Sequence, residues 1–435
     1  MWFTDQYSLP RPIESVYIHA EFLDRGGVSM IRKFTGLWKI LLAPAAAAIV
    51  FPVVPALSQT QPWELTYNQE ARYFSWSGTR GFPAAVVPAN GSGSQFYAPG
   101  TVQLTGVPNE NLKFELVARG GYVTSRQSSA GATGSVSTFT DTVAAATWTY
   151  LGIAGIQPFL TLNANMPTGQ SVLLGNATFA RMDPDLVDIA TFGEGWNFGP
   201  TVGINLPLTS TFILSLGAGY TKRGNYNREN PAVALTETRV DPSDILTFNA
   251  SLTLREGPWA AALTASFSHE NKTLFDGVPS FQLGDRYLVS GTAAYTWSEE
   301  SVTTVTASWN YVRKNQLLNP PPALLLETFN SNSNIYRIRV EHAFTSGKWS
   351  AGPLASYLLR DANTYSPTAF QFVPAKTRWS AGGNLRYSVD DKSLLYMTVE
   401  RVWITENSAP AAAPFPVPNL SSTGWVVAGG ASFRY

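Results

Sequence analysis

Side chains alternate between polar and apolar along most of this chain, and this period of two residues constrains the fold more than any other feature. In residues 334–345, Tyr336, Ile338 and Val340 alternate with Arg337 and Arg339. A β-strand directs successive side chains to opposite faces, so the segment has one apolar face and one charged face. The hidden face of a soluble sandwich must be dry, whereas a charged face behind an aromatic and aliphatic one is typical of a wall between water and lipid. We therefore predict a transmembrane β-barrel, with a soluble β-sandwich as the alternative.

Many segments share this alternation, and the connections between them are alternately short and long. The predicted strands are 63–76, 95–107, 110–124, 137–152, 155–165, 195–206, 210–222, 243–255, 258–270, 284–298, 301–314, 334–345, 348–360, 376–389, 392–405 and 424–435. The long connections are 77–94, 125–136, 166–194, 223–242, 271–283, 315–333, 361–375 and 406–423. The fold class is therefore all-β: an antiparallel up-and-down barrel of about 16 strands, within a range of about 14 to 18, with short periplasmic turns and long extracellular loops.

Two segments, 137–152 and 392–405, do not sort cleanly into two faces. In the second, Arg401 shares its parity with Met397 and Val399. A bulge inserts one residue and exchanges the two faces beyond it. We expect a bulge or a register irregularity in each segment.

Composition supports a membrane barrel and excludes several other classes. The chain has 14% charged and 13% aromatic residues, whereas soluble domains carry about 25% charge. Uninterrupted apolar runs of about 18 residues, which a membrane helix needs, are missing from the sequence. The zero net charge suggests no nucleic-acid partner, and zero cysteines with three histidines suggest no disulfide, metal site or cofactor.

The front of the chain is expected to carry an export signal. Residues 30–58 combine a positive start, a mostly apolar core over 40–54 and small residues before Gln59, which is the pattern of a secretory signal peptide. Residues 1–29 are expected to be a non-native or upstream extension. Residues 59–435 are then the working barrel.

The last predicted strand ends directly on an aromatic residue. Phe433 and Tyr435 share the parity of Trp425, and the chain stops there. This ending resembles the C-terminal signal of porin-like bacterial outer-membrane β-barrels. The resemblance implies that Phe433 and Tyr435 form an assembly signal for the barrel assembly machinery. It also implies a location in the lipid of a Gram-negative cell outer membrane and a last strand that pairs with the first.

A second resemblance lies between residues 158 and 220. It is carried by Met166-Pro167-Thr168-Gly169, by Phe192-Gly193-Glu194-Gly195 and by a hairpin that ends Leu216-Gly217-Ala218-Gly219-Tyr220. These short motifs are similar to those of the putative outer-membrane transporters associated with meta-pathway phenol degradation. The resemblance implies uptake of small aromatic or hydrophobic compounds and assigns no site residue.

Charged residues on the polar parity are candidates for the lining of the lumen. They are Lys113, Glu115, Arg119, Arg286, Arg337, Arg339, Glu341, Arg378 and Arg386. The longest connection, 166–194, carries the acids Asp183, Asp185, Asp188 and Glu194, and would form a constriction if it entered the lumen. Facing rows of opposite charge in a narrow wet passage select permeants. In the alternative, the arginines pair with Glu341, Glu115 and other neighbours to hold the barrel in register, and the loop lies outside.

The predicted function is a passive outer-membrane channel for small solutes, and the protein is not expected to be an enzyme. His269 lies near Ser266 and Ser268, but a histidine among serines at a loop edge is more often a surface residue. The alternative function is a non-conducting barrel that acts through its loops in a structural or surface role. The permeant is expected to be a small molecule, and a homo-oligomer is left open.

Overall fold

The computed structural model describes residues 63–79, 90–129, 132–153, 155–230, 235–318, 323–369, 371–408 and 419–435. The predicted upstream extension and signal peptide, residues 1–58, lie outside these ranges. Of the helices in the described ranges, none is long and apolar enough to cross a membrane.

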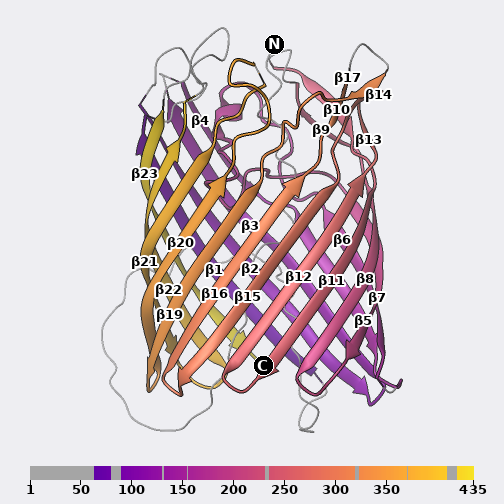
Figure 1. Ribbon diagram of the computed structural model, residues 1–435, viewed down its shortest axis with the longest axis vertical. Helices are drawn as coiled ribbons and strands as arrows, with labels where there is room; N and C mark the ends of the chain where they lie inside the picture. The colour runs from indigo at the N-terminus through magenta and orange to yellow at the C-terminus, as the bar shows by residue number, and fades with distance from the viewer. Residues whose placement is uncertain are drawn as a thin grey trace.

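The chain forms a closed antiparallel β-barrel with sixteen wall positions, which confirms the predicted architecture. Figure 1 shows the tilted strands around a cylinder, with short connections at one end and long ones at the other. The first eight positions are β1 (Trp63–Gly78), β2 (Gly91–Asn109), β3 (Leu112–Ser129), β4 (Ala132–Phe139) with β5 (Thr142–Tyr150), β6 (Gln157–Met166), β7 (Asn197–Pro207), β8 (Phe212–Arg223) and β11 (Ile245–Glu256). The others are β12 (Trp259–Glu270), β15 (Arg286–Ser298), β16 (Ser301–Val312), β19 (Ile335–Ser346), β20 (Trp349–Arg360), β21 (Lys376–Ser388), β22 (Ser393–Glu406) and β23 (Leu420–Arg434).

The first and last strands close the barrel. β1 pairs with β23 in an uninterrupted antiparallel register from Thr66↔Arg434 to Gly78↔Ser422. Beyond that register, the backbone N–H of Tyr435 donates to the carbonyl of Leu65 at 2.9 Å, and the N–H of Leu65 donates back at 3.2 Å. Closure matters because an unpaired backbone group in lipid costs several kcal/mol. The predicted pairing of the C-terminal strand with the first strand is confirmed.

The long connections carry a second sheet that the sequence did not predict. Its six strands are β18 (Leu324–Leu326), β17 (Gln316–Leu318), β14 (Val278–Gln282), β13 (Lys272–Phe275), β10 (Glu237–Asp241) and β9 (Tyr226–Glu229), in this spatial order. Figure 1 shows β9, β10, β13, β14 and β17 beyond the ends of the wall strands. Strands this short, paired with strands of other loops, give little alternation of polar and apolar residues in the sequence. We call this element the rim sheet.

The outer face of the wall is apolar and carries aromatic girdles. Tyr336, Ile338 and Val340 are exposed on it, whereas Arg337 and Arg339 point inward to carboxylates. Trp259, Trp297, Trp349 and Trp403 lie near the ends of wall strands and are 44–65% exposed. An even-stranded closed barrel with this outer band is built as bacterial outer-membrane proteins are. The chain has the fold of an outer-membrane β-barrel, and we call the end with short turns periplasmic and the end with long connections extracellular, as the sequence predicts.

The two irregular segments have different outcomes. β3 advances by three residues between the pairs Tyr122↔Phe139 and Arg119↔Val143, whereas its partner advances by four. The partner strand therefore has one extra residue, at residues 140–141. This is the expected irregularity, and it divides the predicted strand 137–152 into β4 and β5. The expectation for 392–405 is wrong, because β22 keeps an unbroken register with both neighbours. Arg401 lies on the outer face instead, where its guanidinium carbon is 5.1 Å from the ring centroid of Trp425 and its Nη2 donates to Thr423 at 2.8 Å.

The closing strand generates the first prediction. Deleting 433–435 removes the pairs Tyr67↔Phe433 and Thr66↔Arg434 and both backbone bonds between Leu65 and Tyr435. Intact protein in the outer-membrane fraction should run as a compact form in SDS until it is boiled, and the deletion should lose most of that form. Tyr435→Phe keeps every backbone bond and an aromatic end, and should behave as the intact chain does. A normal yield of heat-modifiable barrel from the deletion would show that these residues do not close the wall.

Candidate functional site: the lumen and its inner loop

The connection between β6 and β7, residues 167–196, lies inside the barrel against the inner faces of its strands, and we call it the inner loop. At its far point, the Nζ of Lys376 on β21 forms ion pairs with Asp183 and, at 3.2 Å, with Asp185. Arg360 on β20 pairs with the same Asp185 at 3.2 Å. The Lys376 side chain is 0% exposed. Because an unpaired buried charge is costly, these carboxylates fix the loop to the wall.

Arg378 and Gln95 also hold the main chain of the inner loop. The Nη1 of Arg378 donates to the carbonyls of Asp185 and Leu186, each at 3.2 Å. The side-chain amide of Gln95 on β2 donates to the carbonyl of Ile189 at 2.7 Å, and its oxygen accepts the Ile189 N–H at 3.2 Å. The Gln95 side chain thus satisfies both the N–H and the C=O of Ile189, as the main chain of a neighbouring strand would.

Two apolar patches on the inner wall are covered by the inner loop. One contains Met182, Leu186 and Val187 of the loop with wall residues such as Phe74 and Val402. The other consists of Leu173, Ala180 and Phe192 with Tyr97, Val123 and Val136. Leu173 and Phe192 are at most 1% exposed, and full burial of such a side chain stabilises by about 1.5–3 kcal/mol. The lumen therefore has an apolar core of its own on one side.

The two ends of the inner loop meet at Asp141, in the bulge between β4 and β5. Its Oδ1 accepts the N–H of Gly169 at 2.9 Å, and its Oδ2 accepts the N–H of Glu194 at 2.7 Å and the amide of Asn165 at 2.9 Å. The backbones come so close that a Cβ on Gly169 would lie 1.8 Å from the carbonyl oxygen of Phe192. The Pro-Thr-Gly and Phe-Gly-Glu-Gly motifs of the sequence are thus the two sides of one clasp. We call it the Asp141 clasp.

The predicted constriction acids all lie in the inner loop, but they contact different groups. Asp185 lies 3.8 Å from Arg337, in addition to Arg360 and Lys376. Asp188 lies 3.3 Å from the Nη1 of Arg72 on β1. Glu194 is at the clasp, 3.9 Å from Arg223 on β8.

Arg337 and Arg378 contact the inner loop, and the other predicted lining residues divide into three groups that the sequence did not distinguish. Arg339 lies between Glu341 at 2.6 Å and Glu400 at 2.8 Å, and Arg386 reaches Glu341 at 3.7 Å. Lys113 lies 3.4 Å from Glu115, which also accepts from Gln103, and Arg119 is on the same strand, β3. Arg286 belongs to a separate network at the extracellular end, where Glu270 bridges it to Arg223. Arg286 therefore lies apart from Arg337, Arg339, Arg378 and Arg386.

Burial changes the protonation of Glu194. Desolvation raises its pKa from 4.5 to about 7, with Arg223 as the main opposing influence. Asp141 and Glu270 raise the pKa further, and Arg181 lowers it. Of the titratable groups around the clasp, this carboxyl therefore changes charge near neutral pH.

Several residues of this site were not found from the sequence. They are Arg72, Asp141, Arg223, Glu270, Arg360, Lys376 and Glu400. Lys376 and Arg360 lie at strand ends, where a charged side chain is also expected if it is only solvated at the rim of the barrel. The break in alternation around residue 140 was a usable signal for Asp141, because a bulge often redirects a side chain.

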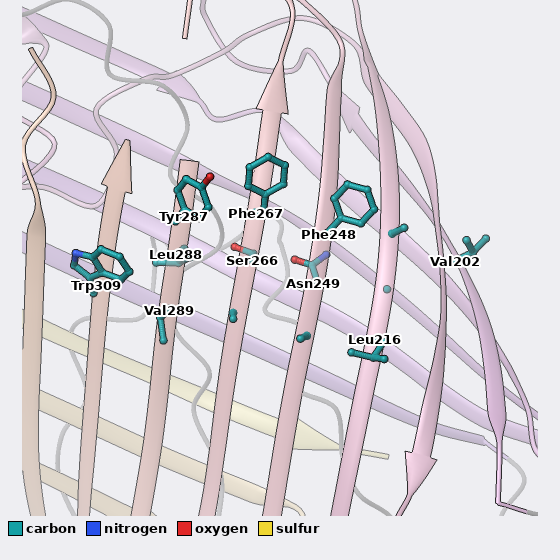
Figure 2. Close-up of a pocket in the computed structure, with 14 residues that line it drawn as sticks. Val202, Leu216, Phe248, Asn249, Ser266, Phe267, Tyr287, Leu288, Val289 and Trp309 are labelled. Carbon is teal, nitrogen blue, oxygen red and sulfur yellow. The ribbon is translucent and has the colours of Figure 1, made fainter. Parts of the chain in front are cut away.

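An apolar groove of about 640 Å³ crosses β7 to β16 on the outer face of the wall. Its floor contains small residues such as Ala250 and Ala265, and Phe248, Phe267 and Tyr287 stand beside one another along it (Figure 2). These side chains have the parity of the exposed aromatics, so the groove belongs to the lipid-facing surface.

His269 lies outside the lumen. Its Nδ1 is 2.7 Å from Asp285 Oδ1, and Asp285 pairs with Arg313. Ser266 and Ser268 have the opposite parity in β12 and face inward. The three residues therefore do not converge on one point.

No protein-family model and no curated protein matches this chain. Solved structures similar to it include a "TodX deltaS2S3 mutant monoaromatic hydrocarbon channel", with 11% identity, 86% of this chain and 91% of that chain covered and a TM-score of 0.39. They also include OccK11 (OpdR) of Pseudomonas aeruginosa, with 10% identity, 86% and 96% coverage and a TM-score of 0.40. OmpT of Vibrio cholerae, an outer-membrane protein, has 12% identity, 87% and 100% coverage and a TM-score of 0.39. At these identities and TM-scores, the likeness does not define what this chain conducts or binds.

The Asp141 clasp generates the second prediction. Asp141→Ala removes an acceptor from both ends of the inner loop, so proteolysis within 167–196 of the folded barrel should speed up by about tenfold or more, since each lost charge-assisted bond contributes roughly 1.5–3 kcal/mol. The rate of loop proteolysis in Asp141→Asn should lie between those of the intact protein and of Asp141→Ala. Asp390→Ala, which removes the acceptor of the Lys392 N–H at a periplasmic turn, is the control and should leave loop proteolysis unchanged. Equal protection in Asp141→Ala would mean that the wall contacts alone hold the loop.

The raised pKa of Glu194 generates the third prediction. A carboxyl whose pKa is about 7 when the loop is docked, and near its ordinary value when it is not, contributes stability below about pH 4.5 that is lost as the pH rises through about 7. The inner loop should therefore be cleaved faster at pH 8 than at pH 5. Glu194→Gln should abolish this difference, and Glu256→Gln at an exposed turn should retain it. A pH dependence that survives Glu194→Gln would assign it to another group.

Proposed function

We propose that this barrel is a passive outer-membrane channel for small solutes. The observation that carries the proposal is the inner loop, which is attached to one side of a sixteen-strand wall by ion pairs, backbone hydrogen bonds and apolar packing. Barrels of about 16–18 strands are wide enough for an aqueous channel. An internal loop held to one side narrows such a channel and leaves the other side for solutes.

The charged residues of the lumen set the ionic character of this channel. Arg339 compensates both Glu341 and Glu400, and Arg337 lies beside Asp185. These arginines are therefore structural ties and lumen charges at once. Rings and rows of fixed charge at a narrow point decide which ions pass.

The permeant and the working form of the chain are parts of the same proposal. Small aromatic or hydrophobic compounds are the permeants that the meta-pathway resemblance implies. Residues 59–435 would be the working barrel, exported with the help of a signal in 30–58, and assembled into outer-membrane lipid through its C-terminal aromatic residues. We assign it no catalytic role. The alternative is a non-conducting barrel whose rim sheet acts at the cell surface.

The fourth prediction separates a channel from a closed barrel. In planar bilayers the purified protein should give discrete conductance steps, and deleting 172–190 should raise the step size about twofold or more because the constriction is gone. Arg337→Ala with Arg339→Ala leaves Asp185, Glu341 and Glu400 without these cations, so selectivity should shift toward cations. Arg434→Ala, a periplasmic end residue 4.0 Å from Glu64, is the control and should change selectivity little. Absence of conductance in the intact protein and in the loop deletion would favour the surface role.

A further inference from the structure

We infer that solutes pass along one half of the barrel wall, which is uncharged between the ends of its strands, and that the preferred permeants are uncharged molecules rich in hydrogen-bonding groups. This inference rests on the proposed channel function, but it names a different substrate class from the aromatic or hydrophobic compounds that the meta-pathway resemblance implies. It follows from the unequal distribution of charge, side-chain size and loop contacts between two halves of the wall.

Charge is segregated around the barrel. Eight neighbouring strands, β5, β6, β7, β8, β11, β12, β15 and β16, carry lysine, arginine, aspartate or glutamate only within two residues of a strand end. We call them the neutral half. The other eight wall positions, β19 to β23 and β1 to β3, form the charged half. It holds the charges that lie farther from the ends of the described wall strands, among them Arg72, Glu115, Arg339, Glu341 and Glu400.

The inner face of the neutral half consists mainly of small polar residues. Inward positions include Asn163, Thr201, Asn249, Ser266, Thr306 and Asn310. Some pair across strands, as Thr147 with Thr161 at 2.9 Å and Thr292 with Thr306 at 3.2 Å. Among the inward positions of these strands, Phe159 is the one aromatic residue, and it lies over Gly203. Such a surface offers donors and acceptors to a solute and little apolar area to a hydrocarbon.

The charged half is filled by its own side chains. Glu115 and Glu400 are 6% exposed, and Leu354, Leu358 and Ser380 are 2–6% exposed. Arginines, glutamates and leucines extend much farther from the wall than serines and threonines do. The open cross-section of the lumen therefore shifts toward the neutral half.

The inner loop covers the charged half as well. Its apolar residues and acids contact β1, β2, β3, β20, β21 and β22. Its contacts with the neutral half are toward the extracellular end, through β4, the Asp141 clasp, Asn165 on β6 and Arg223 on β8. Below this level, the described inward residues of β11, β12, β15 and β16 face the space that the loop leaves.

An ion gains little electrostatic stabilisation along such a path. Between the strand ends of the neutral half it meets hydroxyls and amides without a counter-charge, and the arginines opposite are already compensated by carboxylates. A neutral solute with several hydroxyl or amide groups can exchange its water for the wall groups at little cost. The geometry thus favours neutral polar molecules such as small sugars and polyols over ions and over aromatic hydrocarbons.

The fifth prediction compares a sugar with its carboxylate. Liposomes that contain the full barrel should admit arabinose at least about threefold faster than arabinonate, which has nearly the same size and one negative charge. The chain has no cysteine, so a single introduced thiol can be labelled without background. Labelling Ser266→Cys or Thr306→Cys with a bulky water-soluble thiol reagent should reduce arabinose entry by about threefold or more.

Matched variants test the location of the path. Ala265→Cys and Ala307→Cys are neighbours of these positions that face lipid, and treatment with the same reagent should leave arabinose entry unchanged. Ser356→Cys faces inward on the charged half, beside Ser380, and its labelling should have a much smaller effect than that of Thr306→Cys.

The outcomes separate this inference from the function on which it rests. If the intact barrel passes neither ions nor arabinose, the channel proposal fails and the inference fails with it. If the barrel conducts ions but arabinonate enters as fast as arabinose, the channel stands and the substrate class is wrong. If labelling at Ser356 blocks entry as strongly as labelling at Thr306, the path along the neutral half is wrong.

Discussion

Backbone hydrogen bonding in lipid is the constraint on which the rest of this structure depends. Every strand in the wall must find two partners, because hydrocarbon offers no water to its N–H and C=O groups. The pairing of β1 with β23 meets this condition and turns a sheet into a cylinder. Once the cylinder is closed, the alternate side chains have two separate environments, and the inward set must be polar, paired or covered. The inner loop, its ion pairs and its apolar patches are all consequences of how that inward set is arranged.

The inner loop is held by contacts that differ in strength and in specificity. Burial of residues such as Leu173 and Phe192 supplies general cohesion. The ion pairs of Asp185 supply little net energy after desolvation, but breaking one of them leaves a buried charge, and the effective cost is about 3–5 kcal/mol. The apolar contacts therefore keep the loop in the lumen, whereas the charges and the Asp141 clasp decide where along the wall it lies.

Much of the barrel could be predicted because a period of two residues is a local property. The faces of the strand around Arg337 and Arg339 follow directly from their neighbours Tyr336 and Ile338. The rim sheet could not be found in this way, since its strands have three to five residues and pair across different loops. The partners of Asp185 were only partly identified for a related reason: Arg360 and Lys376 lie at strand ends, where sequence alone cannot separate a buried partner from a solvated rim charge. Asp141 was signalled by a broken alternation, but what its carboxylate accepts depends on two segments that are far from each other in sequence.

The position of the inner loop has a consequence for the order in which the chain folds. The partners of Asp185 on β20 and β21 follow it by 175 and 191 residues, so they are among the last parts of the chain to be synthesised. The clasp at Asp141, by contrast, joins residues within about one hairpin and one loop, and can form early. Contacts between distant residues form late because a long intervening chain must first be ordered. The inner loop would then be held only at its two ends until β20 and β21 are in place and their arginines and lysine can pair with it. Closure of the cylinder and completion of its interior would be a single late event, so that a barrel sealed with the loop outside would have to reopen its wall to correct the error.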